Sequence, residues 1–382
     1  MKRSWLWAVL PLTILGILIA VFLRLNPLQV LVGSAPPVES IQIERAVLKS
    51  DEPIRLLIRG NGTDPVQIAQ VQVDGAYWQF QQDPPGEISR LKSVQIEIPY
   101  PWMEGETHHI KVLTATGLTF DYSIDVALPT PDADPARLLH YGGLGIFVGV
   151  VPVGLGMLFF PYLKTLGNQG IQFILTLTLG LLAFLLVDSL QEGVKLATEA
   201  ASVFQGGSLV WLSAATAFLT LLMISRRGGN VPEGMALATY LALGIGLHNL
   251  GEGLAIGSAF AVGEAGLGSL LVVGFTLHNL TEGIGIAAPL IRLQPRLWVF
   301  VSLAALAGLP AVLGSWLGAF AYSPQWAALF LGIGSGAILQ VMVEVGSYVR
   351  RLNEPRGSWL TIPGLAGFSL GLGIMYATAL LV

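Results

Sequence analysis

Long apolar runs separated by short polar stretches make up most of this chain. A helix needs about 20 residues to cross a hydrocarbon layer of about 30 Å, and windows of that size reveal nine apolar segments. They lie near residues 5–24, 139–161, 170–188, 208–225, 235–261, 266–291, 297–321, 325–349 and 359–381. The pattern predicts a mainly α-helical, polytopic membrane protein.

Residues 38–128 follow a different pattern. Runs such as "SIQIERAVL", "VQIAQVQVDG" and "SVQIEIPY" alternate apolar and polar positions, and Gly, Pro and Asp-Gly turns separate them. Period two is typical of half-buried strands. About seven short strands in this segment predict a small all-β sandwich, antiparallel and immunoglobulin-like in outline. Pro129, Pro131 and Pro135 predict a stiff linker into a membrane domain that covers residues 139–382.

The N-terminal segment, residues 1–25, has two basic residues followed by an apolar run of about 19 residues. A cleaved signal peptide has a shorter apolar core of about 7–15 residues and a small-residue cleavage site. The nearest such site, "VGSA" at 32–35, fits this pattern poorly. We therefore favour a transmembrane anchor, with a signal peptide as the alternative.

The composition agrees with a membrane protein. Charged residues make up 12% of the chain, compared with about 25% in soluble domains, and the mean hydropathy is +0.68. The net charge of −4 gives no reason to expect nucleic acid as a partner, and the absence of cysteine excludes disulfides and thiolate ligands. The 46 glycines often stand in small-residue spacings, which predict helices that pack closely in lipid.

Basic residues in short loops predict the orientation of the spans. If Lys2 and Arg3 are cytoplasmic, nine spans place residues 38–128 and the C-terminal Val382 outside the cytoplasm. The predicted outer loops, including residues 188–207, then contain one lysine between them. The predicted inner loops contain Lys164, Arg226, Arg227, Arg292, Arg296, Arg350, Arg351 and Arg356. We expect a multi-pass protein of the plasma (cytoplasmic) membrane.

A polar motif occurs twice inside the apolar segments. "LHNLGEGLAIG" at 247–257 is followed 30 residues later by "LHNLTEGIGIA" at 277–287, and the two are identical at seven of eleven positions. Each motif lies near the middle of its segment, close to the centre of the bilayer. On a helix, His248 and Glu252 share one face, as do His278 and Glu282. The two asparagines that follow the histidines, at 249 and 279, lie about 100° further round.

The two motifs offer two imidazoles, two carboxylates and two amide oxygens to one small volume. A carboxylate at the bilayer centre costs roughly 3 kcal/mol, and a divalent cation offsets that cost. Nitrogen and oxygen ligands without sulfur suit Zn²⁺, Fe²⁺, Mn²⁺, Co²⁺ or Cd²⁺ better than Cu⁺. The alternative is a polar network that joins two helices, but the doubled, depth-matched motif favours a metal site.

Paired "HNLGEG" and "HNLTEG" on consecutive membrane helices, within an eight-helix region, resemble the ZIP (Zrt/Irt-like) divalent metal transporters, near their prokaryotic GufA-like branch. The resemblance covers roughly residues 139–382 and leaves the anchor and the sandwich aside. It implies an eight-helix transporter bundle whose fourth and fifth helices hold the metal. It assigns His248, Glu252, His278 and Glu282 to the principal ion, and Asn249 and Asn279 to an adjacent position. Glu282 could bridge the two positions.

The chain departs from the family pattern in its sixth bundle helix. Relatives often have a glutamate where this chain reads "GLPAVLG" at 308–314, so Ala311 leaves open whether one ion or two are bound. An Ala311→Glu change is expected to restore that carboxylate and strengthen binding. The loop between the third and fourth bundle helices, "RRGGNVPEG", also lacks the histidines that relatives carry there.

Three further sets of residues are weaker candidates. Asp188 and Glu192, at the outer end of the second bundle helix, collect cations at the mouth of the pathway or are simply solvated. Glu344 is either an exit ligand or an ion-pair partner of Arg350 or Arg351. His108 and His109 alternate faces on a predicted strand, so both cannot point at one ion without distortion.

The motifs favour a transporter that moves divalent transition metals, zinc first among them, into the cytoplasm. The metal is then the transported substrate, the lipid bilayer is the other partner, and no organic cofactor is expected. The alternative is an intramembrane metal-dependent hydrolase, which needs a general base and an open coordination position. No HExxH signature is present, and both motif glutamates are already assigned as ligands, so we expect no enzyme activity. The oligomeric state stays open, with a homodimer among the options.

Overall fold

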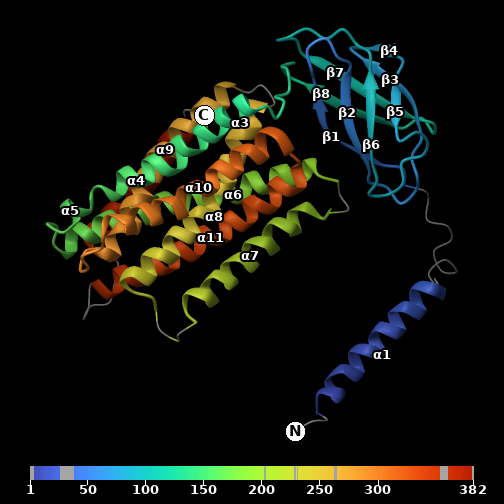
Figure 1. The fold of residues 1–382 in the computed structure, drawn as a ribbon. Coiled ribbons are helices and arrows are strands. Elements are labelled where there is room, and N and C mark those ends of the chain that lie inside the picture. Colours follow the sequence, from blue (N-terminus) through green and yellow to red (C-terminus); the bar gives the residue numbers. More distant parts are fainter. Residues whose placement is uncertain are drawn as a thin grey trace.

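The computed structural model describes residues 4–25, 38–201, 204–227, 229, 231–261, 265–352 and 360–380 (Figure 1). Several positions used for the topology prediction lie outside these residues. They are Lys2, Arg3, the stretch 32–35, Arg356 and Val382. The predicted orientation of the spans therefore stays a prediction.

Residues 41–124 form a small β-domain of two four-stranded antiparallel sheets. One sheet has the order β1-β2-β6-β5 and the other β4-β3-β7-β8. This is the ABED and CFG arrangement of immunoglobulin constant-type domains, with β4 added at one edge. The bounds are β1 Ile41–Val47, β2 Ile54–Gly60, β3 Ile68–Val73, β4 Ala76–Trp78, β5 Gln81–Asp83, β6 Ser93–Ile98, β7 His108–Thr114 and β8 Thr119–Ile124. The prediction of a small antiparallel sandwich is confirmed, with eight strands in place of seven.

The core of the β-domain comes from the period-two pattern. On β2, Ile54, Leu56 and Ile58 are fully buried, and the residues between them are only partly covered. Leu56 lies opposite Ile96 of β6, which is also fully buried. The alternation therefore places one face of each strand in the space between the sheets, where apolar burial stabilises the domain.

The rest of the chain is helical. Its elements are α1 Ser4–Leu25, α3 Pro135–Gly145, η1 Ile146–Val150, α4 Val151–Met157, α5 Phe160–Leu163, α6 Asn168–Glu199, α7 Gly206–Ser225, α8 Gly234–Ala261, α9 Ala265–Ala287, η3 Ala288–Leu290, α10 Leu297–Ala321, α11 Pro324–Leu352 and α12 Ile362–Ala379. Within the described part of the chain, seven helical segments are long and apolar enough to cross a membrane. They are Pro135–Leu163, Asn168–Glu199, Gly206–Ser225, Gly268–Leu290, Leu297–Ala321, Pro324–Leu352 and Ile362–Ala379.

Seven of the nine predicted spans thus have the length and composition of membrane helices. Helix α8 has 28 residues, which is also long enough, but its central His, Asn and Glu lower its mean hydropathy. In α1, the stretch Thr13–Phe22 is an apolar helix that is shorter than the seven candidate spans. The structure therefore supports a multi-pass membrane protein.

Two predicted segments differ from the structure. The first bundle segment is not one regular helix, because a π-helical stretch, Ile146–Val150, separates α3 from α4. The predicted outer loop at 188–207 is wrong over most of its length, because α6 continues to Glu199. Residues 188–199 consist mainly of good helix formers, and the glycine among them, Gly193, packs against Val210 and Leu331.

Glycines bring α8 and α10 into close contact. A Cβ on Gly253 of α8 would collide with the carbonyl oxygen of Ala311, and one on Gly314 of α10 would collide with that of Leu250. Gly257 and Gly318 repeat these contacts one turn further along. The predicted close packing through small residues is confirmed for this pair, and it places α8 at the centre of the bundle.

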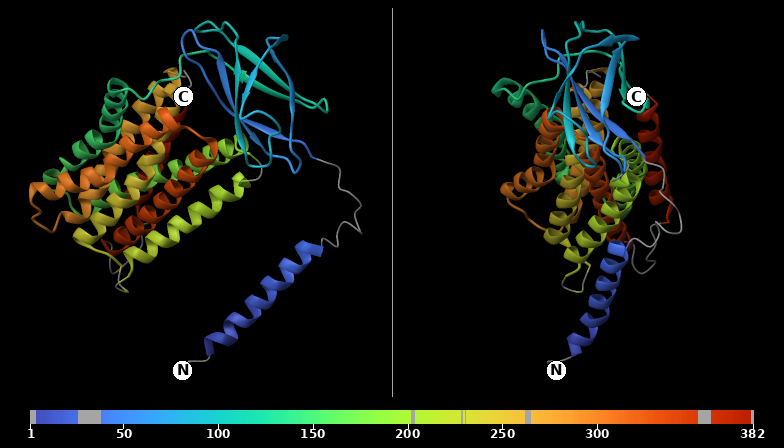
Figure 2. Two further views of the ribbon diagram at one scale, coloured as in Figure 1. Left: turned by 45° about the vertical axis from the view of Figure 1, so that its right-hand side comes forward. Right: turned by 90° about the vertical axis from the view of Figure 1, so that its right-hand side faces the viewer.

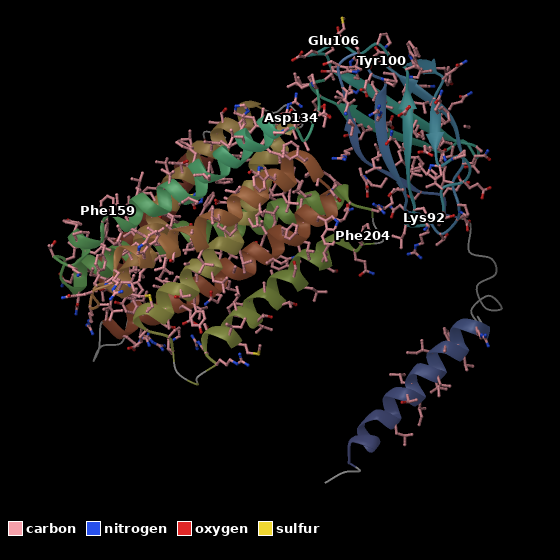
Figure 3. The ribbon with its side chains drawn as sticks, in the orientation of Figure 1. Lys92, Tyr100, Glu106, Asp134, Phe159 and Phe204 are labelled. Atoms are coloured by element: carbon pink, nitrogen blue, oxygen red, sulfur yellow. The ribbon has the colours of Figure 1, made fainter. Side chains whose placement is uncertain are left out.

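The β-domain lies at one end of the helical bundle, near the ends of α6 and α7 (Figures 1 and 2). The chain passes from the β-domain into α3 close to Asp134, and Phe204 lies near the base of the β-domain (Figure 3). The linker is attached to the β-domain, because Thr130 N donates to Leu48 O at 2.7 Å and Leu48 N donates to Thr130 Oγ1 at 3.0 Å. Asp134 then caps α3 by accepting a hydrogen bond from Arg137 N.

Candidate metal centre

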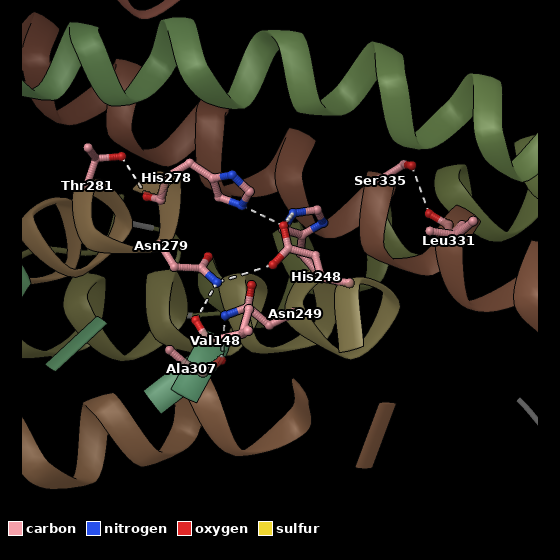
Figure 4. A network of polar contacts seen from close by, with 10 residues as sticks. Val148, His248, Asn249, His278, Asn279, Thr281, Ala307, Leu331 and Ser335 are labelled. Atoms are coloured by element: carbon pink, nitrogen blue, oxygen red, sulfur yellow. Dashed lines mark hydrogen bonds and ion pairs between the residues drawn. The ribbon is translucent and has the colours of Figure 1, made fainter. Parts of the chain in front are cut away.

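Three side chains of the repeated motifs meet between α8 and α9. Nε2 of His278 lies 2.5 Å from Oε1 of Glu252, and Nε2 of His248 lies 2.9 Å from the same oxygen. The potential ligand atoms of the three residues lie within 4.8 Å of one another. All three side chains are buried, and their contacts are drawn in Figure 4. Beyond this contact with Glu252, Nε2 of His248 has no partner among the described residues.

The two asparagines are held by their amide nitrogens. Nδ2 of Asn249 donates to Ala307 O of α10 at 2.9 Å, and Nδ2 of Asn279 donates to Val148 O of the π-helical stretch at 3.0 Å. Asn279 also donates to Oε2 of Glu252 at 3.2 Å. Both Oδ1 atoms are buried and have no hydrogen-bond partner within the described residues. The neighbouring helices therefore hold each amide so that its oxygen stays available as a ligand.

Glu282 is 1% exposed and lies one helical turn from His278. Neither of its carboxylate oxygens has a hydrogen-bond partner in the part of the chain that the structure describes. Glu282 is not part of the three-residue group whose ligand atoms approach within 4.8 Å. An unpaired carboxylate in such surroundings is costly, so Glu282 is the group that most needs a cation nearby.

The i,i+4 pairing predicted from the motifs holds for His248 and Glu252 only. His278 contacts Glu252 on the neighbouring helix. The backbone carbonyls of Ala307 and Val148, which position the asparagines, have no signal in the sequence, because they depend on how α10 and the π-helical stretch pack against the motif helices. The structure thus joins four of the six motif residues, because His248, His278 and Asn279 all contact Glu252. Asn249 is held by Ala307 of α10, and Glu282 forms no hydrogen bond or ion pair with the other five.

A cavity of about 770 Å³ reaches this centre. His248 and Glu252 of α8 line it together with Asp188 and Glu192 of α6. The two carboxylates that the sequence placed at a pathway mouth therefore share one cavity with the histidine and glutamate of α8.

Glu344 does not join the centre. It is fully buried on α11, where it accepts a hydrogen bond from Ser225 Oγ at 2.8 Å and forms an ion pair with Arg226 Nε at 3.3 Å. The predicted pairing with Arg350 or Arg351 is wrong, because Arg351 instead contacts Glu233 at 3.1 Å. The packing of α11 against α7 decides the partner.

The two adjacent histidines of β7 point to opposite faces, as the strand pattern predicts. His108 is buried, and its Nδ1 lies 2.9 Å from Oδ2 of Asp74. His109 is exposed, and its Nδ1 lies 3.0 Å from Ser123 Oγ. They do not share a ligand position.

Ala311 is buried where α10 meets the π-helical stretch. A Cβ placed on Gly149 would lie 2.8 Å from the Cβ of Ala311, so the side chain of Ala311 faces backbone at close range. The expectation that Ala311→Glu strengthens metal binding is therefore revised, since a glutamate has no room there without moving α10.

The sequence matches no protein-family model and no curated protein. Its apolar helices and its buried His–Glu–His cluster are compatible with a membrane protein that handles metal ions.

Proposed function

We propose that this protein carries divalent transition-metal ions across a membrane into the cytoplasm, in the manner of a ZIP transporter, with zinc first among its substrates. The observation that carries the proposal is the buried cluster of His248, Glu252 and His278, beside the unpaired Glu282. None of the described Lys or Arg residues forms an ion pair with either glutamate. A bound divalent cation supplies the missing positive charge.

The ligand atoms suit a first-row divalent ion. Zn²⁺ binds imidazole nitrogen and carboxylate oxygen at about 2.0–2.2 Å, so ligands around one ion are about 3.3 Å apart. The cluster spans up to 4.8 Å, so small side-chain rotations suffice to close it around an ion. The free amide oxygens of Asn249 and Asn279 offer further ligands at the same depth.

The cavity favours a transport site over the alternative interpretation, a closed site with a purely structural role. A purely structural polar network does not require a cavity of about 770 Å³ with His248 and Glu252 in its lining. Alternating access to buried central ligands is the general mechanism of such carriers. With a membrane potential of about 100 mV, inside negative, an ion of charge 2+ gains about 4.6 kcal/mol on moving inward, so no second ion is required to drive uptake.

Uptake into proteoliposomes tests the proposal. Vesicles that contain the purified full chain and a metal-sensitive dye are exposed in parallel to Zn²⁺, Cd²⁺, Mn²⁺, Co²⁺ and Fe²⁺. We expect saturable uptake of at least one ion by the wild type and its loss in Glu252→Gln, which keeps the shape of the side chain but removes its charge. Equal uptake by both proteins, or by empty vesicles, would refute the proposed transport.

A further inference from the structure

The cavity above the metal centre is walled by both parts of the molecule. Besides Asp188 and Glu192 of α6, its lining includes Arg45 of β1, Tyr122 and Ser123 of β8, and Asp125 just after β8. Leu128 and Thr130 of the linker contribute as well. We call this space the vestibule.

The wall that the β-domain contributes is held in place. The hydroxyl of Tyr122 accepts a hydrogen bond from Ala46 N at 3.2 Å, which ties β8 to β1 across the two sheets. Thr130 is bonded to Leu48 through its backbone and its side chain, and Lys49 forms an ion pair with Asp132 at 2.6 Å. These contacts fix β8 and the linker to β1 and the residues that follow it, so the part of the vestibule wall that they form is ordered.

Negative charge predominates in the vestibule. Its lining contains carboxylates from both parts of the chain, against the two basic residues Arg45 and Lys195. Among these carboxylates, Glu44 is paired with Arg59, and Glu192 is paired with Lys195. Asp125 and Asp188 form no ion pair with any residue that the structure describes, so their charges act on whatever enters.

The residues of the vestibule nearest the metal centre suit a cation as the ligand. His248 and Glu252 line the vestibule, both are 3% exposed, and the ring Nε2 of His248 has no partner in the described chain besides the Glu252 carboxylate 2.9 Å away. A cleft lined by one sign of charge raises the local concentration and the arrival rate of ions of the opposite sign.

We propose that ions reach the metal centre through the vestibule and that the β-domain forms part of this access route. Asp125 of the β-domain attracts cations to the vestibule and repels anions from it. The identity of the ions rests on the proposed function, whereas the route and its charge preference rest on the shared cavity.

The absence of cysteine allows a direct test of the route in the full chain. Ala255→Cys places one thiol in the vestibule wall on α8, close to Glu252. Its reaction rates with a cationic and an anionic methanethiosulfonate reagent are compared at low salt. Ser258→Cys, in the same wall, replaces this reporter if Ala255→Cys does not fold.

The decisive variants are Asp125→Asn and Asp121→Asn, each combined with the thiol. Both remove one carboxylate from the β-domain. Asp121 does not line the vestibule and pairs with Lys111, so Asp121→Asn is the control. We expect Asp125→Asn to slow the cationic reagent and speed the anionic one about twofold each, a change of about fourfold in their ratio. The effect should vanish near 1 M salt, where the screening length is about 3 Å.

A ratio unchanged by Asp125→Asn, or changed equally by Asp121→Asn, would overturn the proposal. The reagents carry no metal, so the outcome does not depend on whether the protein transports metal ions. Failure of metal uptake in proteoliposomes would leave the accessibility result standing, and the reverse is also true.

Discussion

His278 of α9 and Glu252 of α8 meet across two helices, with Nε2 of the histidine 2.5 Å from Oε1 of the glutamate. The contact joins the two copies of the repeated motif. Because Glu252 also approaches His248 at 2.9 Å, this one carboxylate is the shared element of the cluster. The buried Glu282 is left without such a partner among the described residues.

The unpaired Glu282 predicts opposite effects of one substitution with and without metal. Glu282→Gln removes a buried charge, so without metal we expect the protein to be more stable by about 1–3 kcal/mol. With metal, the wild type gains about 2.7 kcal/mol at roughly 100 times Kd, and the variant should gain much less. Thermal unfolding in detergent, with a chelator and with Zn²⁺, measures both. A variant that is less stable without metal would show that Glu282 has a structural partner.

Breaking the Glu344–Arg226 pair should destabilise the bundle. Arg226→Met leaves Glu344 fully buried with Ser225 as its remaining partner. We expect a loss of about 1–3 kcal/mol, reduced by the partial exposure of Arg226. Arg350→Met is the matched control, because Arg350 is exposed on the last turn of α11. Chemical unfolding should separate the two variants, and equal stabilities would contradict the role assigned to the pair.

Helix packing at the centre predicts the effect of adding one methyl group. In Gly253→Ala the new Cβ collides with the carbonyl oxygen of Ala311, so α8 and α10 must separate. We expect a cost of about 1–3 kcal/mol. Gly274→Ala on α9 is the control, because a Cβ there meets nothing within 4 Å. Thermal unfolding of both variants in detergent checks this, and a tolerated Gly253→Ala would argue against the observed approach of the helices.

Asp74 predicts a pH dependence of the β-domain. Burial raises the pKa of this carboxyl. Hydrogen bonds from the His109 backbone N–H, His108 and Tyr100 together lower the pKa by more than burial raises it, so the net pKa lies below its usual value of 3.8. A pKa that is lower in the folded state stabilises the domain above pH 3.8, and this contribution is lost as the pH falls through the folded-state pKa. Acid unfolding of wild type and Asp74→Asn should therefore differ at neutral pH, and the difference should disappear as the pH falls below the folded-state pKa of Asp74. Curves that stay parallel would exclude this role.

The period-two and apolar patterns predicted most of the fold, since each depends only on local side-chain spacing. They missed β4 and β5, because strands of three residues are too short to show a period. They also ended α6 too early, because its last turns, up to Glu199, leave the apolar pattern while the backbone stays helical.

The motif residues were predicted, but their pairing was not. His278 turns towards Glu252 because glycines set the rotation of α9: a Cβ on Gly283 would collide with the carbonyl oxygen of Val153, and one on Gly156 with that of Leu280. Glu344 pairs with Arg226, 118 residues away. Such contacts depend on tertiary packing, which a single sequence does not reveal.

The most direct test of the metal centre is anomalous X-ray scattering from crystals of the protein grown with Cd²⁺ or Zn²⁺, recorded on both sides of the zinc edge for zinc. We predict an anomalous peak within coordination distance, about 2.0–2.4 Å, of His248 Nε2, His278 Nε2 and a carboxylate oxygen of Glu252. The same peak should be absent from crystals of Glu252→Gln. Metal peaks confined to other parts of the protein, with none between α8 and α9, would contradict the assignment.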